Sequence, residues 1–310
     1  MYAAETAGGA SSGSSPCLET STLKIVGDQT GRYAQYAYYL GGRDVGIIDY
    51  HSPLNILISV KGHPYERDAF AAVFESLEGI RHTFVEQPAS QAFMNPEAAA
   101  PYDALVFYDM PGIDFSTQPP GFVAPPENLK KGFMDLLSEG KGMVFLHHAI
   151  AGWPLWPEYG EVMGGRFFYS SSECQGKTVL DSGYRHDVAH SVRVLDGDHP
   201  IAAGLGDTLD LTDELYLYEV FDDDVTPLLE SDYTFDREHF YSAHHAVTGK
   251  MFCNEDWPHP NGSGLVGWSK VCRQSRIAYL QPGDGPTTFA SEEYRRLLEN
   301  AIRWSANQGD

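Results

Sequence analysis

The chain has 310 residues, of which 42% are hydrophobic and 21% charged, enough for one sizeable α/β core with insertions. Its formal net charge of −22 argues against nucleic acid and anionic membrane surfaces as partners, because binding phosphates requires a basic surface. No stretch approaches the roughly 20 apolar residues of a membrane span. The N-terminus lacks the pattern of a signal peptide, so we expect a cytoplasmic protein.

The N-terminal part divides into two segments. Residues 1–22 are rich in Ala, Gly and Ser and are predicted to form a flexible tail. In residues 23–52, aromatic and apolar runs are separated by glycines, so we expect an extension packed on the core as a hairpin or as a strand and a helix. Residues 53–310 are predicted to form one α/β domain, since they show no internal repeat and no clear linker.

From residue 55 onward, short apolar runs alternate with helical patterns. The runs predict strands and the patterns with apolar residues every three or four positions predict helices. The first half has strands at 55–60, 82–86, 103–109 and 143–148, and helices at 67–77 and 128–138. The second half has strands at 190–195, 215–221, 226–231, 264–271 and 276–281, and a terminal helix at 292–305. This order predicts a doubly wound, mostly parallel sheet with helices on both faces.

Polar residues at the carboxyl ends of these strands are the first site candidates, because open α/β sheets bind their ligands there. They are His63, Asp109, His147, His148 and Asp284. If the sheet is parallel, these side chains converge on one edge.

The pair His147-His148 stands where a strand runs directly into a helix. Such an elbow presents a nucleophile in many enzymes of this architecture. An imidazole there can act as a general acid or base, or as a metal ligand. Because adjacent side chains point in different directions, we expect one histidine to face the site and the other to hydrogen-bond within the core.

Aromatic side chains follow this elbow. Trp153, Trp156 and Tyr159 lie close together in the sequence, with Arg166 behind them. Their rings could stack on the apolar faces of a sugar or could equally fill the core beside a helix. The two interpretations are about even for the tryptophans.

A second group stands where a loop enters a strand. It consists of the carboxylates Asp213 and Glu214 together with Tyr216. A carboxylate near the histidine pair could fix a tautomer, hold a metal or act as a base. On the sequence alone, an ordinary acidic turn is the stronger interpretation.

Further histidine pairs raise the question of a metal. His186 and His190 have the i, i+4 spacing of a helical metal site, but the residues after them look like a strand. A second pair stands at 244–245. A divalent metal ion is therefore a possible cofactor. The four cysteines show no metal-binding spacing. No GxGxxG follows the first predicted strand, no phosphate-binding loop is present, and no GxSxG stands at a strand-to-helix elbow, so neither a nucleotide cofactor nor a serine hydrolase is expected.

Several motifs, in the same order, are similar to those of the ThuA-like (trehalose utilisation) family. They are GKGMVFLHHA at 140–149, Trp153 and Tyr159 with GGRF at 164–167, DHPIAAGL at 198–205, DELY at 213–216, the segment 267–289, and LLENAIRW at 297–304. The resemblance covers roughly residues 53–306.

The resemblance implies a class I glutamine-amidotransferase-like fold, which is flavodoxin-like and doubly wound. The family lacks the amidotransferase cysteine, and here His147-His148 stands at the corresponding elbow, so glutaminase activity is not implied. Family members are associated with the breakdown of disaccharides and other glycosides, often through 3-keto sugars. This chain departs from them at Asp284, where many relatives carry Gly-His-Asp, and in the segment before residue 53.

The resemblance and the residues together favour a hydrolase or lyase that cleaves or rearranges a glycoside or 3-keto sugar. We expect His147 or His148 as base or acid, with Glu214 as partner or metal ligand. The other candidates that would bind or polarise the sugar are His63 (also a catalytic candidate), Asp109, Trp153, Trp156, Tyr159, Arg166, Tyr216 and Asp284. The alternatives are a catalytically silent sugar-binding or regulatory protein and a tailoring enzyme for a glycosylated natural product. A homo-oligomer is possible.

Overall fold

The computed structural model describes residues 24–27, 34–40 and 43–306, with side chains from residue 48 onward. The predicted flexible tail at 1–22 lies outside the described residues. No helix in the described part of the chain is long and apolar enough to cross a membrane.

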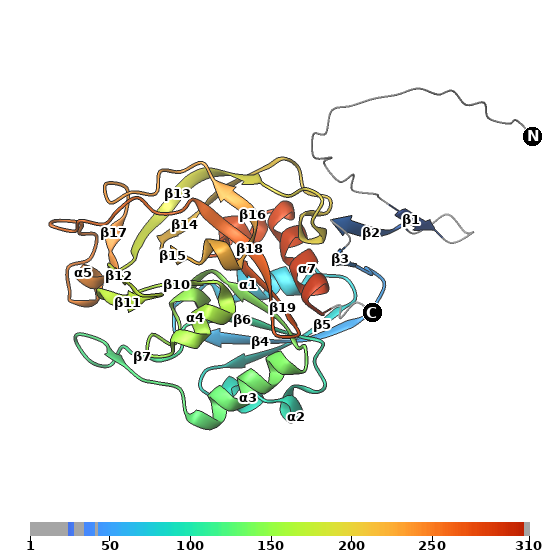
Figure 1. Cartoon of the computed structure of the whole chain (residues 1–310), viewed down its shortest axis with the longest axis horizontal. Helices are drawn as coiled ribbons and strands as arrows, with labels where there is room; N and C mark the ends of the chain where they lie inside the picture. Colours follow the sequence, from blue (N-terminus) through green and yellow to red (C-terminus); the bar gives the residue numbers. More distant parts are fainter. Residues whose placement is uncertain (1–23, 28–33, 41–42, 307–310) are drawn as a thin grey trace, which may run out of the picture.

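Ten strands of the described chain form one central sheet (Figure 1). Its parallel half runs, in spatial order, β5 (Ile80–Glu86), β4 (Leu54–Lys61), β6 (Ala104–Asp109), β9 (Gly142–Leu146) and β19 (Ser275–Leu280). Numbered along the chain, these strands have the order 2-1-3-4-5, which is the flavodoxin-like doubly wound order. The predicted fold class is therefore confirmed.

The other half of the sheet is antiparallel. Its strands, from β19 outward, are β18 (Leu265–Cys272), β16 (Thr226–Ser231), β13 (Gly183–Val194) and β14 (Thr208–Leu217), and β17 (Tyr241–Ser242) also pairs with β13. The strand predicted at 190–195 is the end of the longer β13. The strand predicted at 215–221 covers the end of β14 and the short β15 (Glu219–Val220).

Helices cover both faces of the sheet, because its strands are apolar on both sides. Ile56 and Ile58 pack on the face with α1 (Arg67–Glu75), α6 (Pro286–Ala290) and α7 (Glu292–Ala306). Leu57, between them, packs on the opposite face with α3 (Glu127–Ser138) and α4 (Pro157–Met163). Successive residues of a strand point to opposite faces, and each fully buried aliphatic side chain contributes about 1.5–3 kcal/mol.

Short elements make up the connections. They are η1 (Ala89–Phe93), α2 (Pro96–Ala99), β7 (Ile113–Asp114), β8 (Gly121–Phe122), η2 (His147–Ala151), β10 (Gly165–Arg166), β11 (Ser172–Cys174), β12 (Lys177–Val179), η3 (Pro200–Ala202), η4 (Asp222–Asp224) and α5 (Ala243–Val247).

The N-terminal extension contains strands β1 (Lys24–Gly27), β2 (Ala34–Leu40) and β3 (Arg43–Ile47), which form a small antiparallel sheet beside the main body (Figure 1). This agrees with the hairpin alternative rather than with a strand and a helix. After β3 the chain is fixed to the core. Ile48 is buried, and the Tyr50 hydroxyl donates a hydrogen bond of 2.6 Å to Asn300 Oδ1 in α7.

Candidate functional site

The carboxyl ends of three parallel strands place His63, His147 and Asp284 at one edge of the sheet. His63 follows β4, His147 follows β9 and Asp284 follows β19. The antiparallel half adds Glu214 on β14 and His186 on β13. Residues that are far apart in the sequence thus meet in one cluster.

The turn after β4 depends on Gly62, which brings His63 to this edge. Gly62 has φ +103°, and a Cβ atom at this position would lie 2.3 Å from the carbonyl oxygen of Met110. Only glycine fits such a close approach in this backbone conformation. The β4 turn therefore packs directly against the chain that leaves β6.

His147 occupies the elbow after β9 with a left-handed backbone, φ +44°, which is uncommon for a residue other than glycine. Its Nδ1 lies 2.7 Å from the carbonyl oxygen of Gln281, and its Nε2 lies 3.0 Å from Glu214 Oε2 and 3.5 Å from Asp284 Oδ1. Nδ1–H donates its hydrogen bond to this carbonyl, and Nε2 is the ring nitrogen that faces the two carboxylates. The side chain is fully buried.

The charges around His147 decide its protonation state. Burial opposes a positive charge there, but the hydrogen bond to Glu214 and the negative charges of Asp284, Glu214 and Asp213 outweigh it, and they raise the pKa of His147 to about 9. Burial likewise opposes the charge on Glu214, yet His147 and His186 lower the pKa of its carboxyl. The pair is therefore an imidazolium and a carboxylate at neutral pH.

Glu214 also joins His186 to this pair. Its Oε1 lies 3.1 Å from Nδ1 of His186, whose side chain is 41% exposed, whereas that of Glu214 is only 3% exposed. An irregularity of β13 between Arg185 and Val188 positions His186, since the pairing with β14 shifts there and Asp187 has φ +55°. A continuous path thus runs from the Gln281 carbonyl through His147 and Glu214 to His186.

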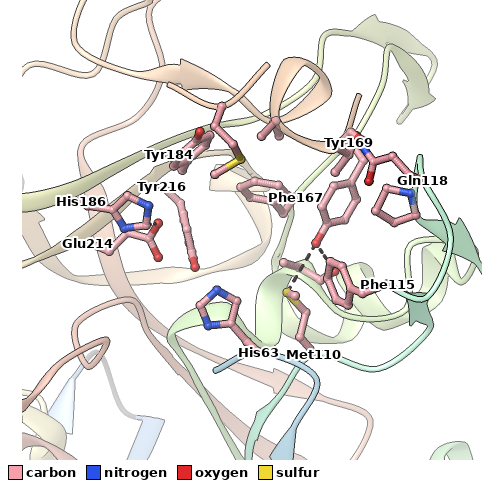
Figure 2. A pocket seen from close by; sticks show the side chains of 16 residues that line it. His63, Met110, Phe115, Gln118, Phe167, Tyr169, Tyr184, His186, Glu214 and Tyr216 are labelled. Carbon is pink, nitrogen blue, oxygen red and sulfur yellow. Dashed lines mark hydrogen bonds and ion pairs between the residues drawn. The ribbon is translucent and has the colours of Figure 1, made fainter. Parts of the chain in front are cut away.

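This path ends at a cavity of about 310 Å³ (Figure 2). Its residues with acid–base or hydroxyl groups at the sheet edge are His63, His186, Glu214 and Tyr216. Its other lining residues, mainly apolar, are Met110, Phe115, Gln118, Pro120, Ala151, Phe167, Tyr169, Tyr184, Ala243, Ala246, Val247 and Met251. Size and lining are typical of a small-molecule site.

Tyr216, one of the expected substrate-binding residues, lines this cavity. Its ring lies 4.6 Å, between centroids, from that of His147, and its backbone N–H donates to Gln281 Oε1 at 3.1 Å. Tyr216 thus forms a wall between the cavity and the buried imidazolium.

His148 is separated from the cavity. It is fully buried, its Nε2 lies 3.2 Å from the Tyr108 carbonyl oxygen, and its ring stands 4.8 Å from that of His63. Burial, together with the nearby His63 and His147, holds its pKa well below the usual range. His148 is thus a neutral core residue beside His63. The two histidines of the elbow therefore have different partners and charges, and neither ring lines the cavity.

Asp109 and the aromatic residues after the elbow lie elsewhere. Asp109, Trp153, Trp156 and Tyr159 enclose a separate space of only about 10 Å³ and are each less than 7% exposed. The tryptophans have no exposed face for a sugar to stack on, so the alternative of core packing is the one that the structure supports.

The contacts of Asp109 and Arg166 are internal too. Asp109 Oδ2 accepts hydrogen bonds of 2.6 Å from Ser59 Oγ and from Gln87 Nε2. The Arg166 guanidinium donates to the carbonyl oxygen of Pro154 and lies over the Phe168 ring. Neither side chain lines the large cavity, so the expectation that they bind substrate lacks support from the geometry.

Asp213 fixes the loop that carries Asp284. Its carboxylate accepts hydrogen bonds from the backbone N–H groups of Gly283, at 2.6 Å, and Asp284, at 2.9 Å. Burial raises the pKa of Asp213 to about 6, although the charge of His147 and these two hydrogen bonds act in the opposite direction. Asp213 therefore positions Asp284 next to His147.

A divalent cation has one candidate place among the described residues. His147, Glu214 and Asp284 offer ligand atoms that all lie within 4.8 Å of one another. A histidine whose other ring nitrogen donates to a carbonyl is a common arrangement in metal sites. The predicted pair of His186 and His190 does not form a site, because both lie on strand β13 and His190 is buried with its Nδ1 2.8 Å from Ser231 Oγ.

Sequence reasoning missed the contact of His186 with Glu214 at the cavity, and it missed Gln281 and the apolar lining. The motif DELY pointed to the strand of Glu214, but only antiparallel pairing with β13 brings His186 next to it. Gln281 is the last residue of a predicted strand, which was a signal that could have found it.

Comparisons with known proteins place this chain in a family. The ThuA family model, described as trehalose utilisation, matches residues 55–305. A ThuA-like protein from Parabacteroides merdae has a similar structure, with a TM-score of 0.59, 16% identity, and coverage of 82% of this chain and 90% of that one.

Two more solved structures are similar. A ThuA-like protein from Bacteroides uniformis has a TM-score of 0.53, 17% identity, and coverage of 82% and 91%. The protein STM3548 from Salmonella typhimurium, named a cytoplasmic protein, has a TM-score of 0.50, 10% identity, and coverage of 81% and 98%. The search of curated proteins found no match. The description of the family model suggests a carbohydrate-related role. Because the model spans most of the chain, this protein belongs to the ThuA family.

Proposed function

We propose that the protein is a carbohydrate-directed enzyme that cleaves or rearranges a glycoside or 3-keto sugar, with His186 as its acid–base residue. The observation that carries the proposal is the path from the Gln281 carbonyl through His147 and Glu214 to His186, which ends in the cavity. It extends the carbohydrate-related role of the family to a specific chemistry.

The path defines the state of His186. A carboxylate acceptor at Nδ1 favours the tautomer with Nδ1–H, which leaves a lone pair on Nε2 to accept a proton. Glu214 remains ionised because His147 is its buried cation. The carboxylate therefore orients His186 and stabilises the positive charge that His186 gains when it takes a proton.

The reaction that fits is elimination from a 3-keto glycoside. The C3 carbonyl acidifies the C2–H bond, and His186 removes that proton. The electron pair of the C2–H bond forms the C1–C2 double bond, the C1–O bond breaks, and the leaving oxygen takes a proton. His63, at the same cavity, is the candidate donor (Figure 2).

A metal would act at His147, Glu214 and Asp284, where it would compete with the proton on His147. Metal analysis of the purified protein, and turnover with and without a chelator, separate a metal-assisted form of the reaction from pure acid–base chemistry. We further propose a cytoplasmic location, in line with the name of the Salmonella protein.

The test compares trehalose, methyl α-glucoside and phenyl α-glucoside, each with and without a 3-keto group, by mass spectrometry of the products. The His186→Ala variant should lose about 10²–10⁴ in rate. The His239→Ala variant is the matched control, because His239 does not line the cavity and its side chain pairs with Asp236 and lies beside the Tyr233 ring. Full turnover in His186→Ala, or saturable binding without any product in the unmodified protein, would overturn the proposal.

A further inference from the structure

The cavity has two chemically different ends. The groups able to exchange protons, His63, His186 and Glu214, gather at the sheet edge, whereas Phe115 and Gln118 lie on the opposite side (Figure 2). Two connections, residues 113–123 and 243–252, contribute mostly apolar side chains to the lining. They meet at Gln118 and Val247, on the side of Phe115 that we call the apolar end, and the second connection ends beside the sheet edge, where the Phe252 ring lies 6.0 Å from that of His186.

Exposed hydrophobic side chains are concentrated in these two connections. Seven large hydrophobic residues of the described chain are strongly exposed, and four of them, Phe115, Val123, Met251 and Phe252, belong to the two segments. Phe115 and Met251 line the cavity and are each 54% exposed. Single exposed apolar residues are ordinary, but a group of them at the mouth of a cavity indicates an apolar ligand.

Hydrogen bonds hold the two connections in place. Gln118 Nε2 donates to the carbonyl oxygen of Val247 at 3.4 Å, which joins one connection to the other. The N–H of Phe252 donates to the Tyr184 hydroxyl at 2.9 Å, and the Ser242 hydroxyl donates to Asp181 Oδ2 at 2.5 Å. The apolar end is therefore built before a ligand arrives.

The apolar end offers few partners to a second sugar. The Tyr169 hydroxyl already donates to the carbonyl oxygen of Ala151 at 3.1 Å, and Gln118 is engaged with Val247. Hydroxyls of a second glucose unit that face these apolar side chains would lose water without gaining hydrogen bonds from them, which disfavours binding. A flat or aliphatic group would instead bury the Phe115 and Met251 side chains.

We infer that the substrate is a glycoside with an apolar aglycone, such as an aryl group, and not a disaccharide. The sugar ring lies at His186 and Glu214, and the aglycone lies against Phe115 and the other apolar side chains of the lining. This inference rests on the proposed function for the sugar end only, since the apolar end is defined by its own side chains.

The experiment measures kcat/KM for the 3-keto forms of phenyl α-glucoside, methyl α-glucoside and trehalose. Phenolate leaves more readily than an alkoxide, so the diagnostic quantity is the part of the preference for the phenyl compound that depends on the apolar side chains. We expect that part to be about 10- to 100-fold, the ratio that corresponds to burying one apolar group of this size. Phe115→Ala and Met251→Ala should each reduce this preference severalfold. Val271→Ala is the matched control, because Val271 is 64% exposed and lies outside the cavity.

A binding measurement separates this inference from the proposed function. Phenyl α-glucoside and methyl α-glucoside are titrated calorimetrically into His186→Ala, which keeps the apolar end intact. Tighter binding of the phenyl compound that is lost in Phe115→Ala supports the inference even if no compound is turned over. Equal affinity for the two glucosides, no binding of either, or a higher kcat/KM for trehalose would overturn the inference. If trehalose alone were turned over, the proposed function would stand and this inference would fail.

Discussion

The Glu214 carboxylate lies 3.0 Å from the imidazole of His147, and both groups are buried between two halves of one sheet. His147 ends a parallel strand, and Glu214 belongs to an antiparallel one. The ion pair thus joins the flavodoxin-like half of the sheet to its antiparallel addition. The second oxygen of the same carboxylate faces His186. One carboxylate therefore links the buried imidazolium of the elbow to a side chain at the cavity.

Replacing Glu214 should reduce both stability and activity. Glu214→Gln removes the closest counter-charge of a buried imidazolium, and loss of one partner of a buried pair costs about 3–5 kcal/mol of unfolding free energy. The variant should also lose about 10²–10⁴ in rate, because His186 loses its orienting carboxylate. Urea unfolding at pH 7 and turnover of the same preparations measure the two effects.

A double variant tests whether the effect comes from the pair itself. His147→Gln with Glu214→Gln should cost less than the sum of the single changes, because both remove the same interaction. Glu230→Gln, whose partner Arg193 is 65% exposed, is the control and should change stability by less than about 1 kcal/mol. Additive losses at His147 and Glu214 would contradict the pairing.

Asp109→Asn should stabilise the protein and leave catalysis unchanged. Burial raises the pKa of Asp109, so its charge costs stability increasingly as the pH rises above the ordinary range of an aspartate. An asparagine oxygen can keep the hydrogen bonds from Ser59 and Gln87, while its amide occupies the side of Oδ1, which has no partner among the described residues.

The measurement for Asp109→Asn is urea unfolding at pH 7 together with turnover. Asp114→Asn is the comparison with the opposite sign, because hydrogen bonds from Ser116 lower the pKa of Asp114 and its charge is favourable. A folded Asp109→Asn protein without activity would return Asp109 to the substrate site.

Gly62→Ala should disturb the site as well as the fold. A left-handed backbone costs roughly 1–2 kcal/mol for a residue with a Cβ atom, and here the new methyl group also meets the Met110 carbonyl oxygen. Gly176→Ala is a matched control, since Gly176 has φ +73° but nothing within 4 Å of an added Cβ. We expect a larger drop in melting temperature for Gly62→Ala, together with reduced turnover because His63 shifts. Equal drops and equal turnover would show that the Met110 contact is unimportant.

The sequence pattern was sufficient for the parallel half of the fold and for placing His63, His147 and Asp284 at its edge, whereas Asp109, predicted there too, lies in a separate space. Apolar runs and helical repeats give the strands before His63, His147 and Asp284, and topology alone brings their ends together. The partners from the antiparallel half were harder. Glu214 meets His186 only through the pairing of β13 with β14 and a local shift of register, and neither leaves a periodic signal in the sequence.

The role of the aromatic residues after the elbow was also open in the sequence, since sugar stacking and core packing were equally compatible with it. Trp156 and Tyr159 have the composition of a sugar platform, yet they pack on Phe133 of α3, with ring centroids 5.3 and 5.8 Å away. That outcome depends on where α3 crosses the sheet, which local sequence does not specify. The same holds for the cavity's apolar end, since its two segments are about 130 residues apart and touch through Gln118 and Val247.

His199 should make the protein less stable as the pH falls. Its Nδ1 accepts the Ile201 N–H at 3.1 Å and its Nε2 lies 3.1 Å from Ser269 Oγ, which is the bonding of a neutral ring. Burial, with the charge of Arg276, lowers its pKa to about 4. The unfolded chain therefore takes up the proton first, near pH 6.5, and the stability from the neutral ring is lost as the pH falls from there toward 4.

The size of this loss can be measured against a variant that does not titrate. The pKa difference corresponds to about 3 kcal/mol of unfolding free energy over that interval. In His199→Asn the amide oxygen can still accept the Ile201 N–H, so the variant should be less stable than the unmodified protein at pH 7.5. The gap should narrow by about 3 kcal/mol as the pH is lowered to 4, as followed by urea unfolding. A gap that stays constant across this range would mean that His199 is already charged, or exposed to water, in the folded protein.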